Sequence, residues 1–189
     1  MEEKIRSFIA IEINNAFAQE LKRIQEHLKN SLDGKINWVE PKNIHLTLRF
    51  LDNITPAQTE QIKQIIIKIA RKNKEFSINP GILSAFPSIL NPQILWVGIA
   101  SGCKQLRDIA KTLQDELAKI NFSPDEKPFH PHLTLGRIKF TKDKKAFGKM
   151  SKEIVVNSSL VSRVNRIVLF KSTLTPQGAI YSPIHTVEF

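Results

Sequence analysis

Cysteine is almost absent from this sequence of 189 residues, in which Cys103 is the only one. A single thiol excludes a disulfide within the chain and a zinc site built on cysteines. No apolar run approaches the roughly 20 residues of a membrane-spanning helix, and residues 1–11 lack the apolar core and cleavage site of a secretory signal. These absences favour a cytoplasmic protein without a membrane partner.

Acidic residues are also scarce, because 18 of them stand against 28 lysines and arginines, for a formal charge of +10. This balance favours an anionic partner such as nucleic acid, a phosphorylated metabolite or a membrane surface. A solvated lysine-rich surface explains it equally well. The length and the 41% of hydrophobic residues suffice for one compact domain, or for one domain built from two similar lobes.

The pattern of apolar residues predicts an alternation of strands and helices. Spacing of three and four residues, with capping residues before it, predicts helices over residues 15–31, 56–72 and 103–121. Pro87 to Pro92 is expected to be a loop, and the basic segment 142–152 can hold a short helix. Apolar and β-branched runs predict strands over residues 5–13, 36–39, 44–51, 76–86, 94–100, 132–140, 154–161, 167–174 and 179–189.

The tetrapeptide His-Leu-Thr-Leu occurs twice, beginning at His45 and at His132. The copies lie 87 positions apart, close to half the chain, and each follows an amphipathic helix by a similar gap. This arrangement indicates an internal duplication. We expect an α+β fold in which residues 1–189 form a single bilobal domain, with two pseudo-symmetric lobes of antiparallel sheet, outer helices and a central cleft.

Alternate residues of a strand point to the same side, so each motif has one polar face. His45 and Thr47 share one face, as do His132 and Thr134, while the leucines face the opposite way. Two imidazoles can serve as the general base and general acid of phosphodiester cleavage. The threonine hydroxyls can hold phosphate oxygens, and no metal is required. A lone His-x-Thr is more often structural, so the second copy carries the argument.

Two arginines follow the motifs and are candidates for holding phosphate. By strand alternation, Arg49 is expected on the same face as His45 and Thr47. Arg137 has the wrong parity, but a bulge at Gly136 would turn it toward the face of His132. Each arginine can instead be a surface cation.

Other residues are weaker candidates for a functional role. His130 and His132 suggest a metal pair, but Pro131 separates them and no cysteine or carboxylate cluster accompanies them, so no metal site is expected. The basic run from Lys139 to Lys152 is usually a solvated face, although it can also follow an RNA backbone. Five aromatic residues are more typical of the core than of platforms on which bases stack: Phe8, Trp38, Phe50, Trp96 and Phe129.

With their flanking segments, the two motifs resemble the RNA 2',3'-cyclic phosphodiesterase family, also called the 2'-5' RNA ligase family, of the two-histidine (His-x-Thr-x) phosphoesterase superfamily. Two departures from the family pattern are Asp52, where glycine is common, and Gln93, where arginine is common. Both could alter the grip on substrate. The resemblance covers residues 6–11, 38–39, 45–51, 86–88, 95–98, 128–137, 172–174 and 178–181.

The resemblance implies hydrolysis of RNA 2',3'-cyclic phosphate ends to 2'-phosphomonoesters without a cofactor. His45 would be the proton donor, His132 the proton acceptor, and Arg137 would help to hold phosphate. It also implies 2'-5' joining of RNA, with tRNA halves as partners, and we expect a monomer. Two alternatives stay open. One is the same chemistry on a 2'-5' oligoadenylate or an ADP-ribose cyclic phosphate, and the other is a non-catalytic RNA- or nucleotide-binding module.

Overall fold

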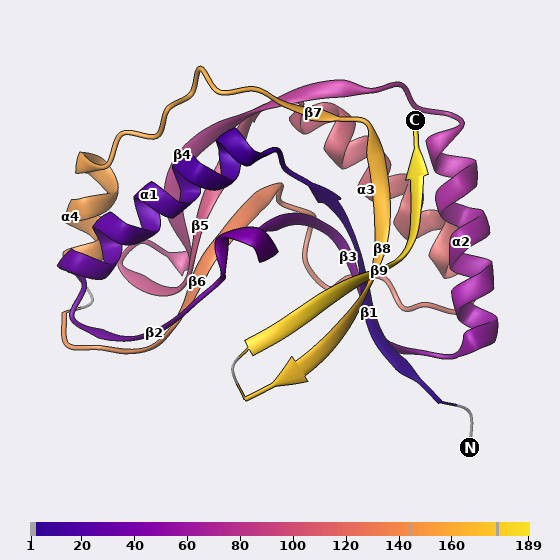
Figure 1. Ribbon diagram of the computed structural model, residues 1–189, viewed down its shortest axis with the longest axis horizontal. Coiled ribbons are helices and arrows are strands. Elements are labelled where there is room, and N and C mark those ends of the chain that lie inside the picture. Colours follow the sequence, from indigo (N-terminus) through magenta and orange to yellow (C-terminus); the bar gives the residue numbers. More distant parts are fainter. Residues whose placement is uncertain (1–2, 144, 177) are drawn as a thin grey trace.

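Two antiparallel sheets form the framework of the protein in the computed structural model, which describes residues 3–143, 145–176 and 178–189 (Figure 1). This architecture confirms the predicted α+β class. One sheet has the order β3 (His45–Ile54), β1 (Ile5–Glu12), β8 (Arg166–Thr175) and β9 (Gly178–Glu188). The other has the order β2 (Gly34–Trp38), β6 (His132–Thr141), β5 (Asn91–Ser101), β4 (Phe76–Ser88) and β7 (Ser162–Val164).

Two helices cover the outer side of each sheet (Figure 1). Helices α2 (Pro56–Ala70) and α3 (Cys103–Ala118) lie against each other beside the sheet of β3. Helices α1 (Asn15–Ser31) and α4 (Ala146–Glu153) lie over the sheet of β6. The helix starts follow the sequence, since Asn14 caps α1 and Thr55 forms a capping box with Gln58 at α2. None of the helices described is long and apolar enough to cross a membrane.

The two halves of the chain repeat one arrangement of paired strands. In the first half Glu12 lies opposite His45 and Ala10 opposite Thr47. In the second half Gly98 lies opposite His132 and Trp96 opposite Thr134. The same histidine and threonine positions therefore recur in the same register, which is the geometry expected of a duplicated unit.

The leucines of both motifs anchor their strands in the hydrophobic core. Leu46, Leu133 and Leu135 are completely buried, and Leu48 is nearly so. They pack with the inner residues of β1 and β5 and with the apolar faces of the helices. Truncating such a leucine to alanine typically costs about 2–5 kcal/mol. The cleft-facing histidines and threonines thus stand on a rigid, close-packed base.

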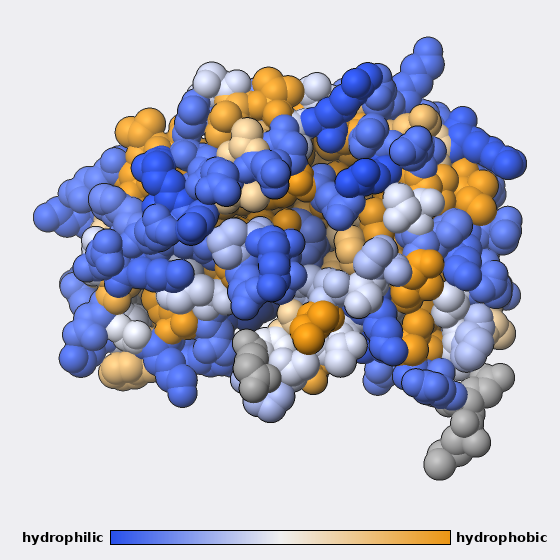
Figure 2. All heavy atoms as spheres, viewed as in Figure 1, coloured by the Kyte–Doolittle hydropathy of each residue, from blue (hydrophilic) through white to orange (hydrophobic). Residues whose placement is uncertain are grey.

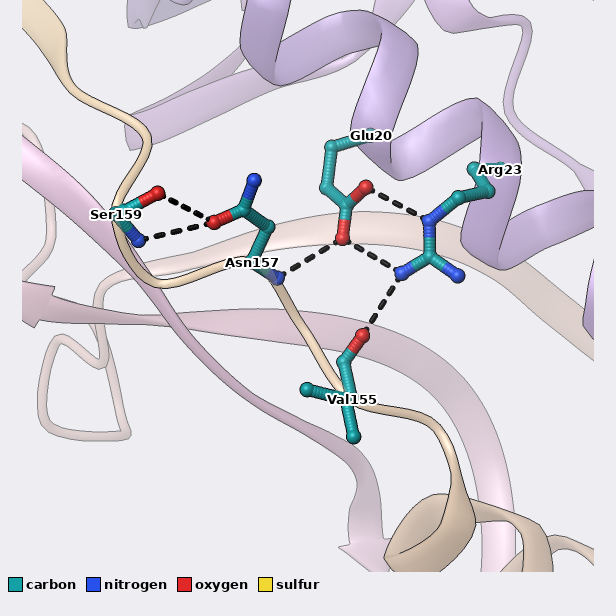
Figure 3. A network of polar contacts seen from close by, with 5 residues as sticks. All are labelled: Glu20, Arg23, Val155, Asn157 and Ser159. Carbon is teal, nitrogen blue, oxygen red and sulfur yellow. Dashed lines mark hydrogen bonds and ion pairs between the residues drawn. The ribbon is translucent and has the colours of Figure 1, made fainter.

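The predicted strand over residues 154–161 is wrong. Backbone groups of this segment form hydrogen bonds with side chains rather than with a neighbouring strand (Figure 3). Glu20 on α1 accepts the backbone N–H of Asn157 at 2.9 Å, and Arg23 donates to the carbonyl of Val155 at 2.8 Å. Further along, Asn79 donates to the carbonyl of Leu160 at 2.8 Å. Pairing begins only at β7, beside β4.

The loop expected from Pro87 to Pro92 is also shorter than predicted. Strand β4 continues to Ser88 and β5 begins at Asn91, so a two-residue turn joins them. Pro87 and Pro92 lie opposite each other at the end of this hairpin. Prolines are tolerated where a strand ends, because no further ladder bond is needed there.

Candidate active site

A β-bulge interrupts each motif strand at its second leucine. Ala10 and Ile9 are neighbours on β1, but their partners on β3 are Thr47 and Arg49, so Leu48 is an extra residue. On β6 the partners of Trp96 and Leu95 are Thr134 and Gly136, so Leu135 is extra in the same way. An extra residue reverses the facing of everything that follows it. The residue five positions after each histidine therefore returns to the cleft face.

This bulge turns Arg137 toward the cleft, but it lies at Leu135, one residue before the position predicted at Gly136. Arg137 is exposed and lies opposite Ile94 on β5 and Asn37 on β2. Gly136 itself faces inward, where an added Cβ would come within 3.0 Å of the ring of Trp38. A larger residue at position 136 would therefore push β2 away from β6.

The same bulge on β3 makes the expected facing of Arg49 wrong. Arg49 lies opposite Ile9 on the core side and is only 7% exposed. Its guanidinium forms an ion pair with Asp125 and donates to the backbone carbonyl of Ser123. Both partners belong to the loop that leads into β6. Arg49 thus ties the first motif strand to the approach of the second, and Phe50 occupies the cleft position instead.

Helix α1 holds the bulge of β6 in place. Gln25 is 1% exposed, and its side-chain amide donates to the carbonyls of Leu135 and Val39 at 2.8 and 2.7 Å. The backbone N–H of Val39 also donates to the carbonyl of Leu135 at 2.9 Å. A bulge leaves ladder groups without their regular partners, and Gln25 satisfies them. The geometry that presents Arg137 is therefore fixed from the core side.

The two histidines are oriented by equivalent contacts. Nδ1 of His45 lies 2.7 Å from the carbonyl oxygen of Asn43, and Nδ1 of His132 lies 2.7 Å from that of His130. A carbonyl oxygen only accepts, so Nδ1 carries the hydrogen in both rings. Nε2 is left as the nitrogen that can take up or release a proton. Each imidazole thus presents one titrating atom in a fixed orientation.

Aromatic rings support both imidazoles, in different ways. Phe8 stacks on His45 with centroids 4.6 Å apart, and Tyr181 meets its edge at 5.2 Å. Phe86 meets His132 edge-on at 5.1 Å, with Trp96 at 6.0 Å. Phe8 and Trp96 are buried, as expected of core residues. Their contact with the histidines depends on strand pairing and has no signal in the sequence.

Burial lowers the pKa of both imidazoles. The pKa of His45 falls from 6.5 to about 4, mainly because the ring is desolvated; the Asn43 carbonyl opposes this and the charge of His132 adds to it. Burial also lowers the pKa of His132, the His130 carbonyl opposes the shift, and the charges of His130 and Arg137 add to it. The two histidines are therefore within electrostatic reach, and both favour the neutral form before an anion binds.

A cavity of about 950 Å³ lies between the two sheets and brings most of the predicted residues together. Its lining includes His45, Thr47, Thr134 and Arg137. His132 does not belong to this lining, and it lies half-buried two residues before Thr134, on the same face of β6. The structure thus places both threonines at the cavity, and Arg49 is the one predicted residue that points elsewhere.

The cavity also has a wall that the motifs did not reveal. The hairpin of β8 and β9 projects beside the cleft (Figure 1) and contributes Leu174, Ile180 and Tyr181 to the lining. Asn43 fixes this hairpin by donating to the carbonyl of Ala179 at 3.1 Å. Phe50, which was expected in the core, is 55% exposed and lines the same wall. The cavity therefore has a largely apolar wall in addition to the cation of Arg137.

The two residues that depart from the family pattern lie in different places. Asp52 lines the cavity and has a φ of 53°, in the left-handed region that glycine adopts most easily. This conformation explains why glycine is common at that position. Gln93 is exposed on β5. Within the described part of the chain, no three His, Cys, Asp or Glu side chains group as metal ligands would.

Comparison with known proteins places this geometry in a family. The sequence model of the LigT like Phosphoesterase family matches the chain twice, over residues 11–96 and 97–181. Two consecutive matches are what an internal duplication produces. The chain therefore belongs to the LigT-like phosphoesterases and is an enzyme of the phosphoester-cleaving class.

Individual relatives agree with this assignment over the full length. The RNA 2',3'-cyclic phosphodiesterase of Aquifex aeolicus is 33% identical over 181 residues, which is 95% of each chain. The solved structure of TT0787 from Thermus thermophilus has a TM-score of 0.83 at 21% identity and covers 97% of each chain. Apo LigT of E. coli has a TM-score of 0.77 at 18% identity and covers 98% of each chain. These two structures share the fold.

Proposed function

We propose that this enzyme hydrolyses RNA 2',3'-cyclic phosphate ends to 2'-phosphomonoesters by acid-base catalysis with His45 and His132. One observation carries the proposal: both imidazoles have Nδ1 held by a backbone carbonyl and Nε2 free, in matching positions of two bulged strands. A cleft with two such groups suits a reaction that removes one proton and delivers another. A module that only binds RNA would not require this pair.

The proposed reaction is an in-line displacement at phosphorus. Nε2 of His132 takes a proton from water as its oxygen bonds to the cyclic phosphorus. The bond from phosphorus to the 3'-oxygen breaks, and His45 donates a proton to that oxygen. The product carries a 2'-phosphomonoester and a free 3'-hydroxyl. His45 suits the donor role because an imidazole of pKa about 4 is a strong acid once it is protonated.

The remaining polar groups of the cleft would hold the phosphate. Hydroxyls of Thr47 and Thr134 stand two residues from the histidines on the same faces and can donate to the non-bridging oxygens. Arg137 supplies a planar cation for the same oxygens. The bound anion would raise the pKa of His45, so that a larger fraction of the donor is protonated when substrate is present.

RNA as the substrate is supported by the formal charge of +10 and by relatives named RNA 2',3'-cyclic phosphodiesterase. The same pair of histidines can serve a 5'-hydroxyl in place of water. Attack on the cyclic phosphate would then form a 2'-5' linkage and release the 3'-hydroxyl, so tRNA halves are included as substrates. A cytoplasmic location, a monomeric state and independence of metals complete the proposal.

Phosphorus NMR on RNA with a 2',3'-cyclic phosphate end tests the proposal directly. In buffer with EDTA, the cyclic resonance should convert to that of a 2'-phosphomonoester. A 3'-phosphomonoester would overturn the assignment of the leaving oxygen, and tight binding without product would favour a binding module. A parallel panel with a 2'-5' oligoadenylate and an ADP-ribose cyclic phosphate separates RNA ends from the other esters.

A further inference from the structure

The cleft face of β6 continues outward past Arg137, along its pairing with the edge strand β2. Arg137 lies opposite Asn37, and both are exposed. The next pair, Ile36 and Ile138, packs against the core. Alternation along β2 returns Lys35 to the side of Asn37, where it lies opposite Phe140.

A third bulge adds one more cation to this side. The partners of Ile36 and Lys35 on β6 are Ile138 and Phe140, so Lys139 is an extra residue there. Two residues of the bulged strand then oppose one residue of its partner. Lys139 and Phe140 therefore stand beside Lys35. We call Lys35, Arg137, Lys139 and Phe140 the β2–β6 strip.

The strip is open to solvent and its charges are available. Phe140 is 59% exposed, and Lys35 and Lys139 are exposed as well. Among the residues that the structure describes, none forms an ion pair with Lys35, Arg137 or Lys139. Hydrophilic residues dominate the part of the surface above β2 and α1 (Figure 2). The β2–β6 strip thus combines an exposed aromatic ring with exposed cations.

We propose that the β2–β6 strip binds the single-stranded RNA that leads into the cleft, on the 5' side of the cyclic phosphate. Lysines and arginines hold phosphates, while an exposed aromatic ring stacks on a base without regard to its identity. One step of two residues along a strand is about 7 Å, so Lys35, Lys139 and Phe140 lie directly beyond Arg137, the member of the strip that lines the cavity. This assignment rests on the proposed function and names the part of the substrate that lies outside the reaction.

Protection of a sheet edge is the competing explanation for the lysines. Edge strands often carry exposed lysines, which prevent pairing with another sheet. Lys35 lies on such an edge, because β2 is the outermost strand of its sheet. Lys139 lies on β6 beyond Arg137, where the pairing with β5 ends, so edge protection accounts for this lysine as well. It does not account for Phe140, because an exposed phenylalanine would not prevent pairing with another sheet. Binding of a stacked base accounts for all of these residues.

The test compares two substrates that differ only in the attached strand. One is a 2',3'-cyclic mononucleotide, and the other is a short single-stranded oligonucleotide ending in the same cyclic nucleotide. In Lys35→Gln/Lys139→Gln, kcat/KM for the oligonucleotide should fall on the order of tenfold, and the slope of its logarithm against log salt should weaken by about 1.4. Phe140→Leu, which keeps an apolar side chain without a flat ring, should cost about tenfold. The mononucleotide should be hydrolysed as by the wild type.

Lys72→Gln/Lys74→Gln is the matched control, because it removes two exposed charges beyond the end of α2 and should change neither rate. Equal loss in this control, or an unchanged oligonucleotide rate in the strip variants, would overturn the proposal. Should the wild type hydrolyse neither the mononucleotide nor the oligonucleotide, the proposed function fails by itself. Fluorescence anisotropy of the labelled oligonucleotide then decides on the strip, with weaker binding expected in the strip variants alone.

Discussion

Arg49 faces the core and Arg137 faces the cleft, although each follows a His-Leu-Thr-Leu motif. In both strands an extra leucine reverses the facing of the residues after it, and Arg137 comes one residue later in its strand than Arg49 does. Arg137 comes five residues after its histidine and reaches the cavity. Arg49 comes four residues after its histidine and reaches Ser123 and Asp125 on the other side. Two arginines that look equivalent in the sequence therefore have different expected roles, one in substrate binding and one in stability.

Replacing Arg137 should impair catalysis without weakening the fold. Arg137→Gln removes an exposed cation from the cavity, and we expect kcat/KM to fall by about ten- to a hundredfold, in line with the loss of a charged hydrogen-bond donor to phosphate. The midpoint of urea unfolding should stay at the wild-type value. Arg137→Lys keeps the charge but loses the planar fork, so it should recover part of the rate. Wild-type kinetics in Arg137→Gln would remove this residue from the site.

Replacing Arg49 should do the reverse. Arg49→Met keeps the buried stem but loses the contacts with Ser123 and Asp125, and we expect the free energy of unfolding to fall by about 2 kcal/mol. Asp125→Asn should cost less, since this side chain is half-exposed. Urea denaturation of both variants measures the difference. If the Arg49→Met enzyme were stable but had a strongly raised KM, Arg49 would instead bind phosphate, as strand alternation alone predicts.

The lowered pKa values of both imidazoles predict an acid-shifted pH profile. In the proposed mechanism turnover needs His45 protonated and His132 neutral, and in the free enzyme burial holds both pKa values below 6.5. Above pH 6.5 the protonated fraction of His45 falls with each unit, so kcat/KM should decline, and at low pH protonation of His132 should lower it again. The kcat profile should lie at higher pH, because bound phosphate raises the pKa of His45. A kcat/KM that rises from pH 6.5 to 9 would contradict these roles.

The same shift should make stability depend on pH. The pKa of His45 is about 4 in the folded protein, against 6.5 as its ordinary value. The unfolded chain therefore binds the proton first, and the contribution of His45 is present above pH 6.5 and is lost as the pH falls toward 4. This contribution is at most about 3 kcal/mol. Urea unfolding from pH 7 to 4 should show a smaller loss in His45→Gln than in the wild type, whereas His27→Gln, at an exposed site on α1, should follow the wild type.

Local patterns were sufficient to predict most elements of the fold and the polar face of each motif. Strand alternation places His45 with Thr47, and the capping box at Thr55 marks the start of α2, because both depend only on residues close in sequence. The facing of Arg49 could not be read in this way. It depends on the β-bulge at Leu48, and this bulge is a property of the pairing between β3 and β1.

Long-range contacts explain the other misses. Residues 154–161 are rich in β-branched and apolar residues, yet their backbone groups bond to side chains of Glu20, Arg23 and Asn79. Tyr181 contacts His45 because the β8–β9 hairpin folds against β1, far from either motif in sequence. Neither arrangement has a periodic signal. The sequence pattern points to the two histidines as candidates, and the tertiary structure determines which residues surround them.

Hydrolysis of a 2',3'-cyclic nucleotide in EDTA by His45→Gln, His132→Gln and the double variant tests the two-histidine pair most directly. Groups that act as one unit are not additive. Each single variant should therefore lose on the order of a hundredfold to ten-thousandfold in kcat, and the double variant should be scarcely slower than the slower single one. Circular dichroism should show the wild-type fold in all three. Near wild-type turnover in either single variant, or losses that multiply in the double variant, would contradict the concerted acid-base pair.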